Sequence, residues 1–139
     1  MAEFLQKALL DVGDSIPHAL MKLPNANLAV VERAKVLEYL LNTEHRSGAS
    51  KARFFAEFGF HRRVWARLAQ ALHEHAQRND VCRIVETKFG PRYAVDGKLQ
   101  APDGRTPMVR TVWQMDYEEV APRLITAYPL PRQGETSDD

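Results

Sequence analysis

The sequence predicts an α+β fold in which N-terminal helices pack on one face of a roughly four-stranded, mainly antiparallel sheet. Apolar residues recur at helical spacing between positions 32 and 78, and short β-branched segments separated by turn sequences follow from position 81. Helices that precede the strands as a block are typical of the α+β class. The 139 residues are enough for one domain of ordinary size.

Three helices are expected before the sheet. The segment 32–41 places its apolar residues at helical spacing, and Ser50 is expected to cap a short helix that runs to Phe58, where Gly59 stops it. The longest helix is expected over 61–78, because Val64, Leu68 and Leu72 form an apolar stripe. A further short amphipathic helix is expected over 2–12.

Four strands are expected over 81–87, 92–99, 108–115 and 122–129, the first two joined as a hairpin near Gly90. The side chains of a strand alternate between its two faces. In the third strand this predicts one face with Val109, Thr111 and Trp113, opposite Arg110 and Val112. In the fourth it predicts one face with Leu124, Thr126 and Tyr128, opposite Arg123 and Ile125. The alternation does not indicate which face meets the helices.

These elements divide the chain into an N-terminal helix and connector (1–22), an α+β domain (23–130) and a polar, acidic tail (131–139). No run is apolar enough for a signal peptide or a membrane helix, so we expect a cytoplasmic protein. Its single cysteine, Cys82, excludes an internal disulfide and fits a reducing compartment.

The net charge of the whole chain is +1, which does not indicate a nucleic-acid-binding protein. Positive charge is nevertheless concentrated between Glu44 and Asn79, where seven Lys and Arg residues accompany three Glu residues, a local balance of 7 − 3 = +4. Within it, one loop and short helix carry His45, Arg46, Lys51 and Arg53, which are groups that suit an anionic substrate. An ordinary solvated loop has the same composition.

Metal chemistry is not expected from the five histidines. His73 and His75 are two residues apart and therefore point to different sides of a helix, whereas helical metal ligands are spaced by three or four. The chain also lacks a phosphate-binding glycine loop, a nucleophile elbow and zinc-type Cys/His spacing. We therefore expect no metal or other cofactor.

Four motifs occur in a distinctive order between about Leu23 and Pro129: LPNA, YLLN-x-EH-x-x-G-x-x-KARFF, RTVW and PRLITAYP. In this order they resemble a bacterial domain family of undefined activity, found as stand-alone proteins and at the C-terminal ends of polymorphic toxins. That family in turn resembles the metal-independent ribonuclease toxins grouped with barnase, EndoU, the colicins and RelE. The resemblance implies an RNA substrate and a small antitoxin or immunity protein as partner.

The resemblance also implies roles for residues at the matching positions. His45 would be the general base or acid for attack of a 2′-hydroxyl group on the adjacent phosphate, which gives a 2′,3′-cyclic phosphate. Lys51 and either Arg110 or Arg123 would neutralise charge on the phosphate. The remaining matched residues would bind the phosphate, the leaving oxygen or a base: Thr126, Tyr128, Thr111 and Trp113. Arg46 and Arg53 are expected to bind substrate on the ground of the local positive charge alone.

Two other classes of function remain open from the sequence. Three helices followed by a hairpin are also the order of elements in a winged helix-turn-helix, in which Arg62, Arg63 and Arg67 would contact DNA. The additional strands over 108–115 and 122–129 count against this reading. Alternatively, the chain is a non-catalytic module that binds another protein, and its arginines serve solubility.

Overall fold

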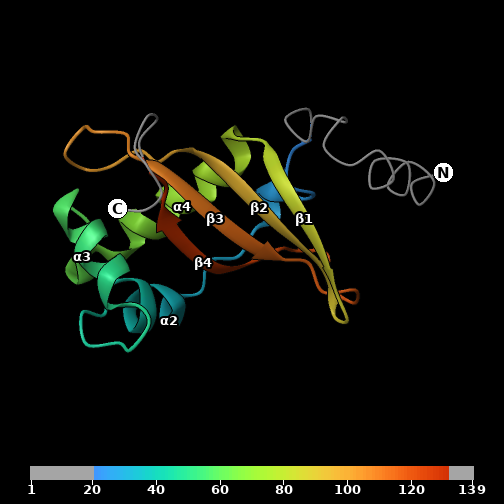
Figure 1. Ribbon diagram of the computed structural model, residues 1–139, viewed down its shortest axis with the longest axis horizontal. Helices are drawn as coiled ribbons and strands as arrows, with labels where there is room; N and C mark the ends of the chain where they lie inside the picture. Colours follow the sequence, from blue (N-terminus) through green and yellow to red (C-terminus); the bar gives the residue numbers. More distant parts are fainter. Residues whose placement is uncertain (1–20, 132–139) are drawn as a thin grey trace.

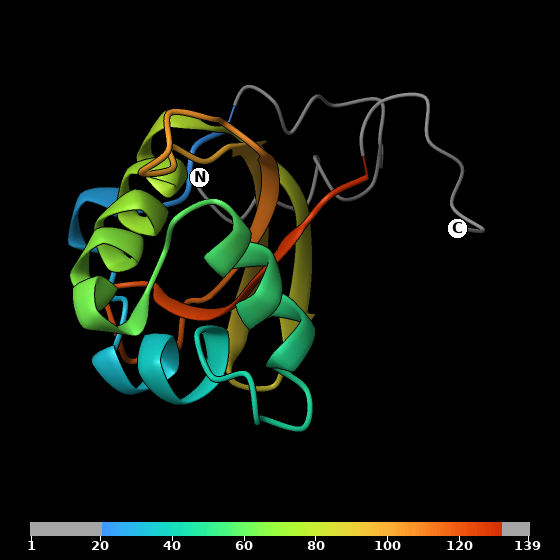
Figure 2. The same cartoon turned by 90° about the vertical axis from the view of Figure 1, so that its left-hand side faces the viewer.

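Four antiparallel strands form one sheet in the order β1-β2-β3-β4 in the computed structural model, which describes residues 21–131. The strands are β1 (Val81–Thr87), β2 (Gly90–Lys98), β3 (Met108–Gln114) and β4 (Arg123–Pro129). Helix α4 lies behind the sheet in Figure 1 and to its left in Figure 2, and no described helix lies over the opposite face. The predicted α+β class is confirmed.

The helical elements are η3 (Ala26–Leu28), α2 (Arg33–Lys35), η4 (Val36–Leu40), α3 (Ala49–Glu57), η5 (Arg62–Val64) and α4 (Trp65–Arg78). The helices expected over 32–41, 50–58 and 61–78 are thus confirmed as α2 with η4, α3, and η5 with α4. The expected helix 2–12 and the tail from residue 132 lie outside the described residues. Within the described part, no helix is long and apolar enough to cross a bilayer.

A widened turn ends the first helical segment. Element η4 is a π-helix, in which the amide of Leu41 donates to the carbonyl of Val36, five residues earlier, at 2.8 Å. Val36 and Leu40 are fully buried on the core side, while Tyr39 reaches the edge strand β4. Single π-turns within helices are frequent at functional sites, and this one positions Tyr39.

The expected cap of α3 is wrong. The helix begins at Ala49 with Gly48 as its first flanking residue, so Ser50 lies inside the first turn and is exposed. The amide of Ala52, which a Ser50 cap would have satisfied, donates instead to the carbonyl of Gly48 at 2.9 Å. The predicted stop is confirmed, because Gly59 follows the helix with a φ of +101°.

The core lies between α4 and the sheet. Leu68 and Leu72 of α4 are fully buried, and they face a side of the sheet on which Val109, Thr111 and Trp113 are all fully buried as well. Each buried aliphatic side chain of this kind contributes about 1.5–3 kcal/mol relative to an exposed one. The alternation predicted for β3 is therefore confirmed, and the structure shows that the Trp113 side meets the helices.

The alternation predicted for β4 is wrong at Leu124, because a β-bulge at Ile125 inserts one extra residue, whereas Thr126 and Tyr128 do share a face as predicted. Leu124 lies opposite Trp113 and Thr126 lies opposite Val112, so these two side chains belong to different faces. Tyr128 lies opposite Arg110 on the face without helices. A bulge reverses the alternation of side chains between the two faces on one side of the inserted residue. No residue type in this strand predicts the bulge.

The winged-helix interpretation does not fit this fold. Strand β2 pairs along its length with β3, which pairs with β4, so the β1-β2 hairpin is part of a larger sheet rather than a free wing. At the start of the third helix, Arg62 donates to the carbonyl of Leu37, while Arg63 and Arg67 are exposed.

Candidate active site at the β4 edge

Three residues nominated from separate segments meet around one side chain, that of Tyr39. The Tyr39 hydroxyl lies 3.0 Å from the Thr126 hydroxyl of β4. The ring of His45 contacts the Tyr39 ring edge-on, with 5.0 Å between centroids. The ammonium nitrogen of Lys51, in α3, lies 5.3 Å from the same ring centroid. We call Tyr39, His45, Lys51 and Thr126 the β4-edge cluster.

The H-x-x-G-x-x-K motif gains a structural explanation in this cluster. A Cβ atom on Gly48 would collide with the carbonyl oxygen of Tyr39 and lie 2.9 Å from its ring atom Cδ1, so only glycine lets the loop approach this closely. Lys51 follows three residues later, one helical turn into α3, and its ammonium group returns to the Ser47 carbonyl at 3.3 Å. The glycine therefore brings the histidine and the lysine against Tyr39.

His45 is held in one orientation by the backbone that follows it. Its Nδ1 atom accepts hydrogen bonds from the amides of Ser47 and Gly48, each at 3.0 Å. Because Nδ1 is the acceptor in this arrangement, the proton of the neutral ring is assigned to Nε2. Nε2 is thus a hydrogen-bond donor on a half-buried ring.

The electrostatics of the cluster lower the pKa of the Tyr39 phenol. Burial of Tyr39 raises its pKa, but the hydrogen bond with Thr126, the neighbouring ammonium group of Lys51 and the charge of Lys35 together outweigh burial and lower the pKa below its ordinary value. A perturbed phenol beside two cations is typical of acid–base sites. Tyr39 begins the YLLN motif, but it was not among the candidate site residues predicted from the sequence. Tyr39 follows Lys35 by four residues, a spacing that places the two side chains side by side on a helix, and this was the signal available in the sequence.

A shallow pocket of about 270 Å³ opens beside the cluster. It is lined by Glu32, Ala34, Lys35, Glu38, Tyr39 and His45. Glu32 and Glu38 balance the charge of Lys35 within the pocket. The positive charge next to Tyr39 therefore comes from Lys35 and Lys51 individually, and the pocket as a whole is not positive.

Arg110 and Tyr128 lie next to this cluster, on the face of the sheet without helices, where Tyr128 follows Thr126 by two residues. Arg110 makes two hydrogen bonds to the Asp96 carboxylate, at 2.6 and 2.8 Å. These bonds, with a smaller contribution from Tyr128, raise the pKa of Arg110 above its ordinary value. Exposed Arg83 and Arg92 line the same shallow groove with Tyr128. We call this surface the open sheet face.

Thr111 and Trp113 are not available to a substrate, which corrects their expected role. Both are fully buried in a hydrogen-bonded network with His75. The indole Nε1 of Trp113 donates to the Thr111 hydroxyl at 2.8 Å, and that hydroxyl lies 3.1 Å from His75 Nδ1. His75 Nε2 lies 2.9 Å from the carbonyl of Val109. Trp113 therefore cannot stack on a base without unfolding of the core.

The other nominated arginines are exposed and lie in different places. Arg46 is in the His45 loop and Arg53 is in α3, while Arg123 of β4 pairs with Asp116 at 3.3 Å. No group of three or more His, Cys, Asp or Glu side chains within residues 21–131 is arranged to hold a metal ion.

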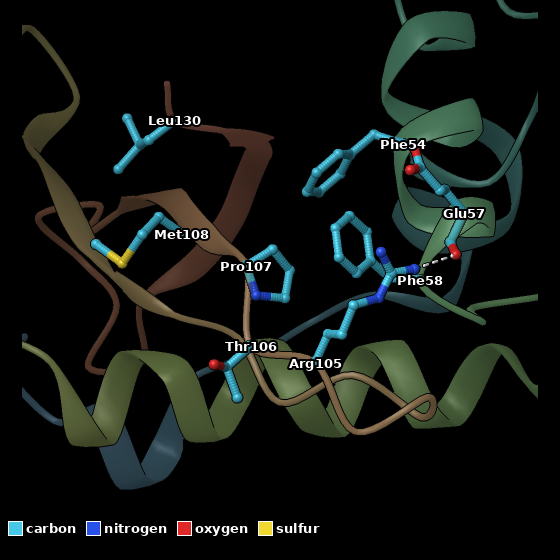
Figure 3. Close-up of a pocket in the computed structure, with 8 residues that line it drawn as sticks. All are labelled: Phe54, Glu57, Phe58, Arg105, Thr106, Pro107, Met108 and Leu130. Carbon is cyan, nitrogen blue, oxygen red and sulfur yellow. Dashed lines mark hydrogen bonds between the residues drawn. The ribbon is translucent and has the colours of Figure 1, made fainter. Parts of the chain in front are cut away.

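A second cavity, of about 480 Å³, lies between α3 and the start of β3 (Figure 3). Its wall includes Phe54 and Phe58 of α3 together with Met108. The guanidinium of Arg105 stacks 4.1 Å from the Phe58 ring centroid and donates to the carbonyl of Glu57 at 2.9 Å, as Figure 3 shows. These contacts fasten the β2–β3 loop to α3, the helix that carries Lys51.

The family model described as domain of unknown function DUF6883 matches residues 22–131. No curated protein matches the chain significantly. A solved chain from a contact-dependent growth inhibition toxin–immunity protein complex of Klebsiella pneumoniae 342 is similar in fold, with a TM-score of 0.60 and 18% sequence identity. The alignment covers 75% of this chain and 95% of that chain.

Proposed function

The chain belongs to the DUF6883 family, and we propose that it is a toxin-type endoribonuclease that cleaves RNA without a metal ion. The observation that carries the proposal is the β4-edge cluster, where His45, Lys51 and Thr126 meet around Tyr39. These groups come from a loop, a helix and a strand, and together they offer the hydrogen-bond donors and positive charge that a reacting phosphate requires. A fold shared with a chain of a toxin–immunity complex supports the same class of function.

The proposed reaction is intramolecular transfer at phosphorus. The 2′-oxygen loses its proton and bonds to the adjacent phosphorus, the bond from phosphorus to the 5′-oxygen breaks, and that oxygen takes up a proton. The products are a 2′,3′-cyclic phosphate and a 5′-hydroxyl end. Lys51 would neutralise the charge that develops on the phosphate oxygens. Because two amides occupy Nδ1 of His45, we assign His45 the role of an Nε2–H donor to the phosphate.

We propose that neighbouring nucleotides cross the open sheet face. Thr126 and Tyr128 are two residues apart on the same face of β4, so their side chains are about 7 Å apart along the strand. Arg110, whose charge is balanced by Asp96, lies opposite Tyr128, and Arg92 and Arg83 add positive charge across the sheet. Arg46 and Arg53 would bind phosphates on the other side of the cluster, where both are exposed.

A small immunity protein is the proposed partner, and the cytoplasm is the proposed place of action. The similar solved chain comes from a toxin–immunity protein complex. A partner that neutralises this chain would place acidic side chains over Lys51 and Lys35, because opposite charges across an interface speed association and fix its register.

Induced expression in a bacterial host tests the proposed function. Wild-type protein should arrest growth and produce RNA fragments with cyclic-phosphate ends, and both effects should be lost in the Lys51→Met and His45→Ala variants. Lys98→Met is the matched control, because Lys98 is an exposed lysine at the end of β2. Normal growth and intact RNA with soluble, folded wild-type protein would contradict the proposal.

The open sheet face favours a second candidate, RNA binding without cleavage. Arg83 and Arg92 are exposed beside Arg110 and Tyr128, an arrangement that suits a phosphate backbone with or without chemistry. This candidate predicts that wild-type protein binds RNA with an affinity that falls as salt rises, yet leaves the RNA intact.

A further inference from the structure

We propose that Tyr39 is a catalytic residue that removes the proton from the attacking 2′-hydroxyl group. The proposal rests on the proposed ribonuclease function and assigns the proton carrier that the histidine and lysine motif alone does not provide. Tyr39 is the first residue of the YLLN-x-EH motif, but the resemblance assigned it no role.

The position of the phenol carries the inference. Tyr39 is half-buried, and its hydroxyl is anchored 3.0 Å from the Thr126 hydroxyl, so the oxygen has a fixed place at the β4 edge. The ammonium groups of Lys51 and Lys35 each lie 5.3 Å from its ring centroid. Two cations and a hydroxyl donor stabilise the phenolate relative to the phenol. A phenol whose charged form is favoured in this way is a better proton acceptor than an ordinary tyrosine at the same pH.

His45 is less suited to the same task. A base needs a free lone pair, and the only lone pair of the neutral ring in this arrangement is on Nδ1, which accepts from the Ser47 and Gly48 amides. If Nδ1 became protonated, both of these hydrogen bonds would be lost. Tyr39 and His45 thus divide the work, the first taking a proton and the second donating a hydrogen bond.

Lys51 supplies the second proton that the reaction requires. The Tyr39 phenolate takes the 2′-hydroxyl proton as the new P–O bond forms, and the Lys51 ammonium gives a proton to the 5′-oxygen as its bond to phosphorus breaks. The resulting phenol and neutral amine are neighbours. Transfer of one proton from Tyr39 to Lys51 restores the starting state, with no metal, oxidant or further reactant.

Tyrosine ionisation can be measured without any substrate. The chain has four tyrosines. Burial, with a smaller effect of Glu86, raises the pKa of Tyr93, and the charge of Glu86 together with burial raises that of Tyr117. In a titration followed by ultraviolet absorbance, an early-ionising tyrosine should be present in wild type and absent in Tyr39→Phe. It should shift upward in Lys51→Met and Thr126→Val. An unchanged titration in Tyr39→Phe would overturn the proposal.

Cleavage kinetics complete the test with a matched control. Tyr39→Phe should lose about 10²–10⁴-fold in cleavage rate and the alkaline rise of the rate that follows phenol ionisation. Tyr117→Phe, the same change at an exposed loop position, should keep the wild-type rate and pH profile. Glu38 lines the same pocket and is the alternative base. A fully active Tyr39→Phe variant, or a loss of activity in Glu38→Gln that Tyr39→Phe does not show, would overturn Tyr39 as the base.

The two proposals fail in different ways. Wild-type protein that does not cleave RNA but retains the early tyrosine ionisation would overturn the ribonuclease function, and with it the catalytic role of Tyr39. Wild-type protein that cleaves RNA while Tyr39→Phe remains active would overturn the role of Tyr39 alone.

Discussion

Two hydrogen-bonded clusters, each built on a histidine and a strand threonine, differ in how their polar groups are used. In the core, Thr111 links His75 to Trp113, and all three are buried. At the β4 edge, Thr126 bonds to Tyr39, which is half-buried and lies beside His45 and two lysines. The core network satisfies its own donors and acceptors, whereas the edge cluster keeps its charged groups partly exposed. The first is suited to stability and the second to chemistry.

The contrast shows why residue type alone did not identify the site. Thr111 and Trp113 belong to the RTVW motif as Thr126 belongs to the TAYP motif, and the two sets looked equivalent in the sequence. Burial separates them, because a group with no exposed surface cannot contact RNA. Each prediction below tests one side of this difference.

The largest expected effect is that of Trp113→Ala. Removal of this fully buried ring leaves a cavity between α4 and the sheet and leaves Thr111 without a donor. The free energy of unfolding should fall by about 3–5 kcal/mol. Tyr39→Phe, at the half-buried cluster, should change it by less than about 1 kcal/mol. Chemical denaturation of both variants measures the difference, and comparable losses would mean that both clusters are structural.

A matched pair of Thr→Val substitutions compares the clusters directly. Thr111→Val leaves the indole nitrogen of Trp113 and Nδ1 of His75 without partners, at a cost of about 1–3 kcal/mol for each buried group. Thr126→Val removes one half-exposed hydrogen bond, which contributes about 0.5–1.5 kcal/mol. RNA cleavage by the folded variants should show the opposite order, with a larger loss for Thr126→Val than for Thr111→Val. Equal stability losses in urea would contradict the contrast.

Gly48→Ala should affect activity more than stability. The added Cβ collides with the Tyr39 carbonyl, so the His45 loop must move away from the cluster. Such overpacking costs about 1–3 kcal/mol, and the displaced His45 and Lys51 should lower cleavage far beyond that loss of fold. RNA cleavage assays below the melting temperature of the variant measure this. Wild-type activity in Gly48→Ala would show that the loop position is irrelevant.

Acid should destabilise the core network. Burial lowers the pKa of His75, against smaller opposing effects of the Val109 and Gly97 carbonyls and of Asp96. Below the unfolded pKa of about 6.5 only the unfolded chain binds this proton, so stability is complete above that pH and falls as the pH drops toward the folded pKa. The slope cannot exceed about 1.4 kcal/mol per pH unit for one group. Melting curves of wild type and His75→Gln should diverge between neutral and mildly acidic pH. Parallel curves would contradict this assignment.

The smallest effect is expected for Ser50→Ala. Ser50 is exposed inside the first turn of α3 and does not cap it. Alanine has the higher helix propensity, so the substitution should stabilise the protein by a few tenths of a kcal/mol, about 0.3–0.5. A loss of about 1 kcal/mol in thermal unfolding would restore the capping role that the sequence suggested.

Periodicity predicted most of the fold, and local backbone irregularities account for what it missed. The apolar stripe of α4 and the alternation of Val109, Thr111 and Trp113 were sufficient to place those elements. The bulge at Ile125 and the π-turn after Val36 depend on tertiary packing, and neither is marked by a distinctive residue. These two irregularities also shape the candidate site, since one positions Thr126 and the other positions Tyr39.

The site was predicted in part for the same reason. His45 and Lys51 belong to a recognisable motif and do lie together. Tyr39 joins the site because Gly48 packs directly against its carbonyl and ring. The spacing of these residues in the sequence does not reveal this contact. Arg110 and Tyr128 lie opposite each other on the open sheet face, on the same side of the bulge as Thr126 but without a hydrogen bond to Tyr39 among the described residues.

Cleavage of RNA by purified protein in the presence of a metal chelator tests the central claim most directly. Wild type and folded Lys51→Met would be incubated with total RNA, and the new ends would be mapped. The account predicts 2′,3′-cyclic phosphate ends with wild type and none above background with Lys51→Met, while Lys98→Met cleaves as wild type does. Intact RNA with folded wild-type protein, or equal cleavage by Lys51→Met, would contradict a ribonuclease centre at the β4 edge.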